Sequence, residues 1–162
     1  MQPGCPQCGK DFVRRSHRQG ALEYLLSSVY VYPFRCQLCT HRFRAFEWGA
    51  RYERHLIDQR EYERIPVRFA ASFSGDGVKG EGTLIELSMG GCSLQTDEGV
   101  MPGELLQLSF KPSEQDPPFG VDTAVVRSAR GTLRGVEFLR LQPAQKDALR
   151  QLVFRHLSQQ RG

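Results

Sequence analysis

From Ile65 onward the pattern becomes that of β-strands, and residues 65–73 alternate loosely between apolar and polar, as a half-buried strand does. Turn signals rich in glycine, at residues 74–77 and 88–91, separate the first runs. Six strands are expected in all, over residues 65–73, 81–87, 92–96, 105–110, 121–128 and 133–139. Short strands at this spacing predict a small antiparallel barrel or sandwich.

A helix is expected to follow the last strand. Pro143 suits the first turn of a helix, and apolar residues then recur at helical spacing. These apolar positions are Leu149, Leu152, Val153 and Leu157. The stripe predicts that the helix caps one opening of the barrel or packs on its side.

A shorter helix is expected near the N-terminus, because Leu22, Leu25, Leu26 and Val29 recur at helical spacing. Pro33 is expected to end it. We expect the leucine stripe to pack inward, in a small core that it shares with aromatic residues. The candidates for that core are Phe12, Phe43, Phe46 and Trp48. Contact of the stripe with a membrane surface or a partner is the alternative.

Two C-x-x-C pairs flank this helix. They are Cys5 with Cys8, and Cys36 with Cys39. Each pair directs two thiolates at one point, and four soft ligands suit a tetrahedral zinc ion. The spacing therefore predicts a structural zinc site in a small zinc ribbon.

Other roles for these cysteines are a disulfide framework or a redox dithiol. Disulfides need an oxidising compartment, and no signal peptide precedes Cys5. A redox pair usually begins a helix in a thioredoxin-like pattern, which is not found here. The fifth cysteine, Cys92, lies in a predicted strand and is expected to be a buried apolar residue. Reduced cysteines and no targeting segment predict a cytoplasmic protein.

The charge of the chain lies at its N-terminal end. Among 162 residues the net charge is +4, and residues 1–58 carry all of it, with nine Lys or Arg against five Asp or Glu. A zinc ion held by four thiolates adds about −2, so the ribbon is only mildly basic. This favours a protein partner for the ribbon over nucleic acid. No apolar run reaches the roughly 20 residues of a membrane span.

Two motifs adjoin the first predicted strands. Arg60 and Arg64 form an R-x-x-x-R pattern, and Glu86, Ser88 and Gly91 fit an x-x-S-x-x-G pattern. With residues 135–138 (Gly-Val-Glu-Phe) and the terminal helix, this order resembles the PilZ domain family over residues 59–160. The resemblance implies a mainly β fold, a six-stranded antiparallel β-barrel with a C-terminal helix. It also implies binding of cyclic di-GMP and no catalytic activity, so the protein is not expected to be an enzyme.

Carried onto this chain, the resemblance gives Arg60 and Arg64 the role of holding the ligand. Arginine offers a planar fork for phosphate oxygens or for the O6/N7 edge of guanine. Glu86, Ser88 and Gly91 take the positions of the second motif. Position 86 departs from the family, which has Asp or Asn there, and the longer side chain of Glu86 changes the geometry of the acceptor.

The expected organisation is a zinc ribbon over residues 1–48, a linker over 49–58 and a PilZ-like barrel over 59–162. We expect cyclic di-GMP to bind the barrel and to reorient the ribbon toward a protein partner. The alternatives are a ribbon that binds nucleic acid, or a protein adaptor, with a barrel that binds no ligand.

Overall fold

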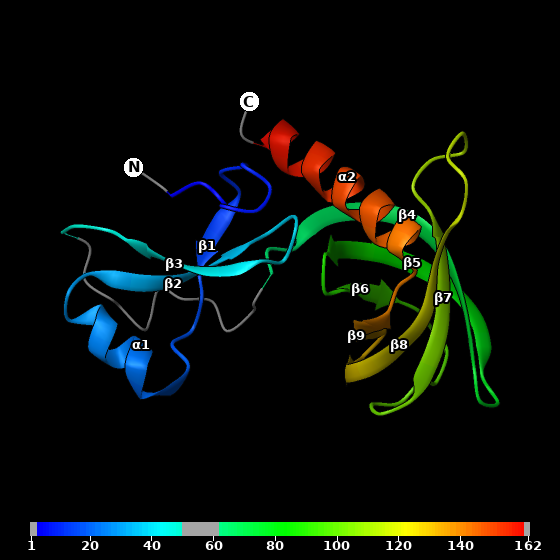
Figure 1. Ribbon diagram of the computed structural model, residues 1–162. Coiled ribbons are helices and arrows are strands. Elements are labelled where there is room, and N and C mark those ends of the chain that lie inside the picture. Colours follow the sequence, from blue (N-terminus) through cyan, green and yellow to red (C-terminus); the bar gives the residue numbers. More distant parts are fainter. Residues whose placement is uncertain (1–2, 50–61, 161–162) are drawn as a thin grey trace. The chain divides into compact units, whose positions relative to one another are not determined.

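The computed structural model describes residues 3–49 and 62–160 (Figure 1). The chain divides into two compact units, Met1–Glu63 and Arg64–Gly162, and each is described by itself. The predicted linker, residues 49–58, falls almost wholly outside the described residues, so the predicted domain limits stay predictions. No helix among the described residues is long and apolar enough to cross a bilayer.

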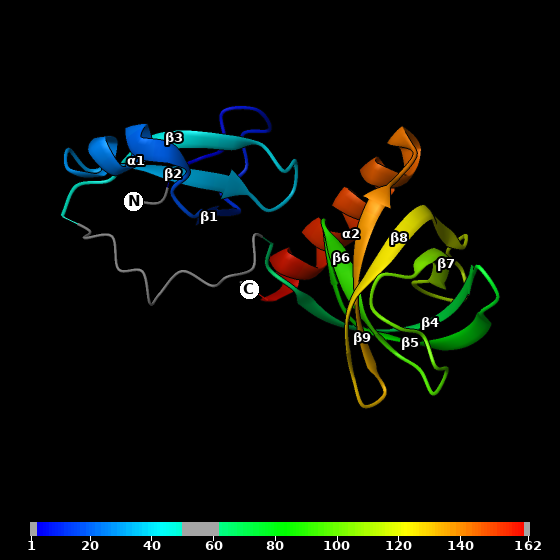
Figure 2. The same cartoon turned by 90° about the horizontal axis from the view of Figure 1, so that it is seen from below.

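The second unit is a closed six-stranded antiparallel barrel, as predicted. Around the barrel the strands follow the order β4-β5-β6-β9-β8-β7, and β7 closes the ring by pairing with β4 (Figure 2). The strands are β4 (Ile65–Gly75), β5 (Lys79–Ser88), β6 (Gly91–Gln95), β7 (Leu105–Lys111), β8 (Phe119–Arg130) and β9 (Leu133–Arg140).

The barrel closes around a mainly apolar core, and β4 shows the pattern. On β4, Phe69, Ala71 and Phe73 are buried while the residues between them are more exposed, which is the period of two expected of a barrel wall. Phe69 stacks on Phe110 of β7 with ring centroids 6.0 Å apart. Cys92 is fully buried on β6, as predicted, and burial raises the pKa of its thiol strongly.

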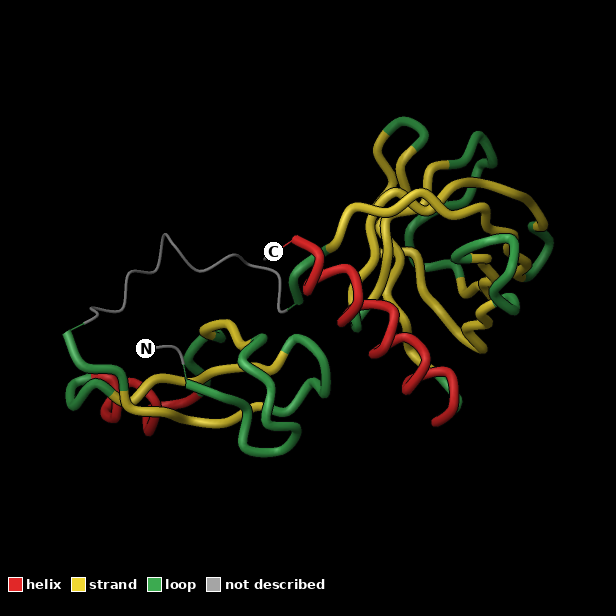
Figure 3. The backbone as a smooth tube through the Cα atoms, turned by 90° about the horizontal axis from the view of Figure 1, so that it is seen from above, coloured by secondary structure: helices red, strands yellow, loops and turns green. Residues whose placement is uncertain are grey.

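Helix α2 (Pro143–Gln160) packs against β4 and β8 on the outside of the barrel (Figure 3). Its buried residues are Leu149, Leu152, Val153 and Leu157, so the predicted stripe is confirmed. The ring of His156 meets Phe69 edge-on at 6.0 Å, which adds an aromatic contact between this helix and β4.

In its described residues, 3–49 and 62–63, the first unit is a small ribbon with one helix. Strands β1 (Val13–Arg15), β2 (Val31–Cys36) and β3 (Arg42–Phe46) form an antiparallel sheet in the order β1-β2-β3. Helix α1 (Gly20–Ser27) packs against β2. The helix ends well before Pro33, which lies inside β2, so the predicted role of this proline was wrong. After the helix the chain turns into β2 through Tyr30, which adopts a left-handed φ of 61°.

The predicted packing of α1 is also wrong. Of the four aromatic candidates for the ribbon core, Phe12 is buried and Phe43 is half-buried, whereas Phe46 and Trp48 are exposed. Leu22 and Leu25 are exposed as well, and the residue of α1 that is buried against the sheet is Glu23.

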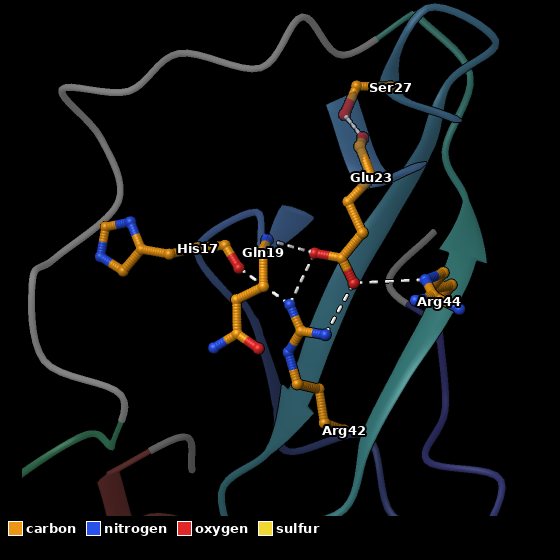
Figure 4. A network of polar contacts seen from close by, with 6 residues as sticks. All are labelled: His17, Gln19, Glu23, Ser27, Arg42 and Arg44. Atoms are coloured by element: carbon orange, nitrogen blue, oxygen red, sulfur yellow. Dashed lines mark hydrogen bonds and ion pairs between the residues drawn. The ribbon is translucent and has the colours of Figure 1, made fainter. Parts of the chain in front are cut away.

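Two arginines on β3 explain this orientation (Figure 4). Arg42 donates to both carboxylate oxygens of Glu23, at 2.6 and 2.7 Å, and Arg44 donates to one of them at 3.2 Å. The backbone N–H of Gln19 donates at 2.6 Å. Hydrogen bonds from Arg42 lower the pKa of Glu23 to about 2. A buried carboxylate with this many charge-assisted donors fixes the face that α1 turns to the sheet.

Candidate functional site

The four cysteines of the C-x-x-C pairs converge on one point. The Sγ atoms of Cys5, Cys8, Cys36 and Cys39 all lie within 4.8 Å of one another. Cys5 and Cys39 are 3.5 Å apart and Cys8 and Cys36 3.6 Å, far longer than a disulfide bond. A tetrahedral zinc ion with Zn–S bonds of about 2.3 Å needs sulfurs about 3.8 Å apart. The cluster is therefore compatible with a small zinc ribbon.

The two knuckles have the same local structure. Cys5 N–H donates to the carbonyl of Lys10, and Cys36 N–H to the carbonyl of His41, both at 2.9 Å. Each turn contains a residue of left-handed φ directly after the second cysteine, Gly9 at 70° and Thr40 at 65°. The turns thus bring each pair of thiols to the same side of the chain.

Backbone amides also point at the sulfurs. The N–H groups of Leu38 and Cys39 lie 3.4 and 3.5 Å from the Sγ of Cys36, as donors to a thiolate would. Burial raises the pKa of Cys39 to about 12, and the neighbouring sulfurs add to the shift. Four thiolates in one cluster therefore need the charge of a bound cation.

A second polar cluster lies where β4, β5 and β6 adjoin. Arg64, the residue before β4, donates from Nη1 to Glu86 Oε2 at 3.1 Å and to Ser93 Oγ at 2.8 Å. The Ser93 hydroxyl donates in turn to the same oxygen of Glu86 at 2.7 Å. The Arg64 side chain is partly exposed and that of Ser93 is buried. The cluster presents a guanidinium that is already oriented and still reached by solvent.

The hairpin between β5 and β6 sets this arrangement. Ser88 pairs with Gly91 across a tight turn, and this register places Glu86 directly opposite Ser93. Pro66 pairs with Glu86 on the other side, so Arg64 comes from the strand that flanks β5. Cross-strand neighbours in such a pair lie close enough for their side chains to meet.

Ser88 and Gly91 both stabilise the turn between β5 and β6 and its surroundings. Ser88 is buried, its hydroxyl donates to the carbonyl of Gly91 at 3.1 Å, and it accepts from the N–H of Gly90 at 3.3 Å. A Cβ on Gly91 would lie 2.1 Å from the carbonyl oxygen of Val136. Glycine is thus needed there for the close approach of β6 to β9, and it is not among the residues with positive φ.

The structure brings together Arg64 and Glu86 of the predicted site, and Ser88 with Gly91. Arg60 lies outside the described residues. Ser93 was missed, although a signal was available in the sequence. Once residues 88–91 are taken as a hairpin turn, counting back from the turn on each strand places positions 86 and 93 opposite each other.

The fold and this cluster define the class: a small closed β-barrel with an arginine held beside the hairpin between β5 and β6. Residues 58–155 match the model of the PilZ domain family. This is more than half of the chain, which therefore belongs to the PilZ family. No curated protein matches the chain.

Solved structures have the same fold at low sequence identity. The PilZ domain of Escherichia coli YcgR with c-di-GMP is 16% identical, with a TM-score of 0.53 over 64% of this chain and 95% of that one. The complex of E. coli YcgR with c-di-GMP is 18% identical, with a TM-score of 0.54 over 92% of this chain and 75% of that one. The Bacillus subtilis inhibitor of motility (MotI/DgrA) is 17% identical, with a TM-score of 0.58 over 82% of this chain and 70% of that one.

Proposed function

We propose that this protein is a receptor for cyclic di-GMP, and that it binds the ligand without transforming it. The observation that carries the proposal is the pre-oriented guanidinium of Arg64, which two neighbouring side chains hold and solvent still reaches. Membership of the PilZ family supports it, as do the two similar YcgR structures, both of which are complexes with c-di-GMP.

Arg64 suits this ligand chemically. Cyclic di-GMP offers two phosphates and two guanines, and arginine can pair in a bidentate way with either. Its ion pair with Glu86 is partly exposed, and such pairs contribute only about 0–1 kcal/mol. The ligand can therefore draw Arg64 away from Glu86 at small cost. We assign Arg60 to the same role, and Ser88 and Gly91 to the shape of the turn beside the ligand.

Arg64→Ala is expected to weaken cyclic di-GMP binding about tenfold to a hundredfold, because it removes a charged partner of the ligand. Arg68→Ala is the matched control, since Arg68 is an exposed arginine on the same strand outside the motif. Titration calorimetry measures both. Equal affinities for the wild type and the two variants, or no binding by any of them, would contradict the proposal.

Glu86→Asp tests the departure from the family motif in the same calorimetric series. We expect it to tighten binding about tenfold, because the shorter side chain restores the acceptor position of the family. Glu81→Asp makes the same change elsewhere on β5 and should have no effect. Weaker binding by Glu86→Asp would mean that the longer carboxylate is needed to position Arg64.

We further propose that the four cysteines hold a structural zinc ion. Residues Cys5, Cys8, Cys36 and Cys39 would be its ligands, and the ion would supply the charge that four neighbouring thiolates need. The soft donor set and the sulfur separations support zinc. A reduced cluster of this kind fits the cytoplasmic location expected from the sequence, which stays a prediction.

We also propose that the ligand reorients the ribbon and changes the face that it offers to a protein partner. Residues before Arg64 are fastened to the ribbon, since Tyr62 accepts from Arg35 at 3.1 Å and Glu63 N–H donates to Gln37 at 2.6 Å. Arg64 itself is held by the barrel. The ribbon unit ends at Glu63, so a ligand that binds Arg64 contacts the residue that directly follows this unit.

Small-angle scattering tests this reorientation. We expect cyclic di-GMP, at a concentration that saturates the wild type but not Arg64→Ala, to change the scattering curve of the wild type and to leave that of the variant unchanged. A ligand shifts an arrangement only through its different affinity for the two states. Identical curves for the wild type with and without ligand would refute the reorientation and leave the receptor function standing.

A further inference from the structure

The ribbon exposes large apolar side chains over α1 and the end of β3. Trp48 is 76% exposed and Leu25 69%. The other members are Leu22, Val29 and Phe46, and we call these five residues the apolar face. Contiguous apolar surface of this kind in a soluble unit marks an interaction site.

The helix contribution follows from the burial of Glu23. Successive residues of a helix are about 100° apart, which puts Leu22 and Leu25 roughly 100–160° away from the direction of Glu23. Glu23 faces the sheet, so these two side chains face outward, and Val29 in the turn after the helix is exposed as well. Residues 20–29 contain no other charged residue, so the outer surface of α1 carries no charge at all.

The strand contribution joins the helix at the turn between α1 and β2. Phe46 pairs with Val31 in the register of β2 and β3, and it lies on the same side of β3 as Arg44 and Arg42, which bind α1. The ring of Trp48 lies 6.1 Å from that of Phe46 and 4.9 Å from that of Tyr30. Tyr30 directly follows Val29, so the two parts of the apolar face meet there.

The charges near the apolar face favour an anionic partner. The two carboxylates nearby are matched, Glu23 by Arg42 and Arg44, and Glu47 by Arg15 at 2.6 Å. Arg18 stacks over Tyr24 of α1 at 4.2 Å, which places a further cation beside the helix. Over residues 3–49 the sequence has seven Lys or Arg and three Asp or Glu.

The cysteine cluster does not offset this charge locally. Cys36 ends β2, whereas Val31 beside Phe46 begins it. At about 3.3 Å per residue the two ends are about 17 Å apart, roughly twice the Debye length at physiological salt. The negative charge of a zinc–thiolate centre is therefore screened from the apolar face.

We propose that the apolar face docks on an anionic lipid surface. Outward leucine, valine and phenylalanine side chains would enter the acyl boundary, Trp48 would lie at the headgroup level, and arginines such as Arg18 would meet the phosphates. Helix α1, with eight residues, would lie in the plane of the interface. This docking does not depend on the proposed binding of cyclic di-GMP.

Trp48 is the only tryptophan of the chain, so its fluorescence reports on the apolar face directly. The experiment adds vesicles of phosphatidylglycerol and phosphatidylcholine, or of phosphatidylcholine alone, to the zinc-loaded full chain. We expect the emission to shift to shorter wavelength, and the protein to sediment with the vesicles, when the anionic lipid is present. No shift and no sedimentation with anionic vesicles would overturn the proposal.

Leu25→Glu is expected to lower vesicle binding about tenfold or more, and Arg18→Gln about fivefold. Leu139→Glu is the matched control, because Leu139 is an exposed leucine of the barrel, and it should leave binding unchanged. Zinc content verifies folding, and Phe46→Ser is a second variant of the face with the same expected loss. Binding that none of the face variants weakens would overturn the proposal.

Two further outcomes would assign the apolar face to another occupant and so overturn lipid docking. One is a dimer in vesicle-free sedimentation equilibrium that Leu25→Glu dissociates, which would mean that a second copy covers the face. The other is a monomeric protein whose Trp48 emission lies at short wavelength before vesicles are added and does not change when they are. This would mean that another part of the chain covers the apolar face.

Discussion

Removing the proposed zinc ion from the four-cysteine cluster is expected to unfold the ribbon and to leave the barrel folded. The ribbon has a small apolar core, in which the buried aromatic residues are Phe12, Tyr32 and Phe34. A unit of this size rarely folds on its apolar burial alone. Binding of zinc to such sites contributes about 10 kcal/mol or more, which then is the folding free energy of the unit.

Two-dimensional amide NMR of the full chain, before and after a strong chelator, measures this effect. Amide signals of residues 3–49 should collapse to the narrow range of an unfolded chain, while those of 64–160 stay in place. The reason is that the barrel closes its own sheet and has its own core. Zinc added back should restore the ribbon signals.

Cys36→Ser should have the same effect as the chelator, and Cys92→Ala is its matched control. Cys92 is the cysteine outside the cluster, buried in the barrel, so its loss should leave zinc content at one ion per chain. A ribbon that keeps its dispersed signals without metal would contradict the structural role of zinc.

Much of the fold could be predicted because the barrel depends on local patterns. Alternation along β4 and the spacing of Leu149, Leu152, Val153 and Leu157 each reflect burial against a single core, and both were read correctly. The cysteine cluster was predictable for a related reason. A C-x-x-C turn fixes the geometry of its own two thiols, so only the meeting of the two turns depends on the fold.

The packing of α1 could not be predicted in this way. Hydrophobic periodicity assumes that the apolar stripe faces the core, and here the sheet presents Arg42 and Arg44 to the helix. A carboxylate that satisfies both arginines therefore occupies the inward position, and Leu22 and Leu25 face outward. The sequence contains Glu23 and both arginines, but only the pairing of β2 with β3 shows that they meet.

The cluster of Arg64, Glu86 and Ser93 could be predicted from the sequence only in part. Arg64 and Glu86 are both motif residues, and their ion pair follows from the pairing of β4 with β5. Ser93 belongs to no motif and joins them through the hairpin register alone. Side-chain roles that depend on register become predictable only after the turn has been placed.

The burial of Glu23 leads to the largest effect expected of a single substitution outside the metal site. Glu23→Ala should lower the free energy of unfolding of the ribbon by about 3–5 kcal/mol, because it leaves the guanidinium of Arg42 near the helix without its carboxylate. The Glu23 side chain is only 1% exposed and that of Arg42 22%, so most of this ion pair is shielded from water. Hydrogen exchange of ribbon amides in the zinc-loaded full chain measures the change.

Glu47→Ala is the matched control. Glu47 pairs with Arg15 at 2.6 Å, but both side chains are partly exposed, and such pairs contribute about 0–1 kcal/mol. The two glutamates lie in the same unit and both bind arginine. A difference in the free energy of unfolding between the two variants therefore measures the effect of burying the ion pair. Equal and small effects of the two substitutions would mean that Glu23 does not fix the orientation of α1.

The pH dependence of ribbon stability is a second measurement of the contribution of the Glu23 carboxylate. The folded pKa of Glu23, about 2, lies below the usual value near 4.3, so the ionised carboxylate stabilises the folded ribbon. That stability is fully present above about pH 5 and is lost as the pH falls toward 2. The gap between wild type and Glu23→Gln should therefore stay constant from pH 8 to 5 and narrow below about pH 4. The difference between the variants isolates the carboxyl down to the pH at which protonation of the cysteines releases the metal from both.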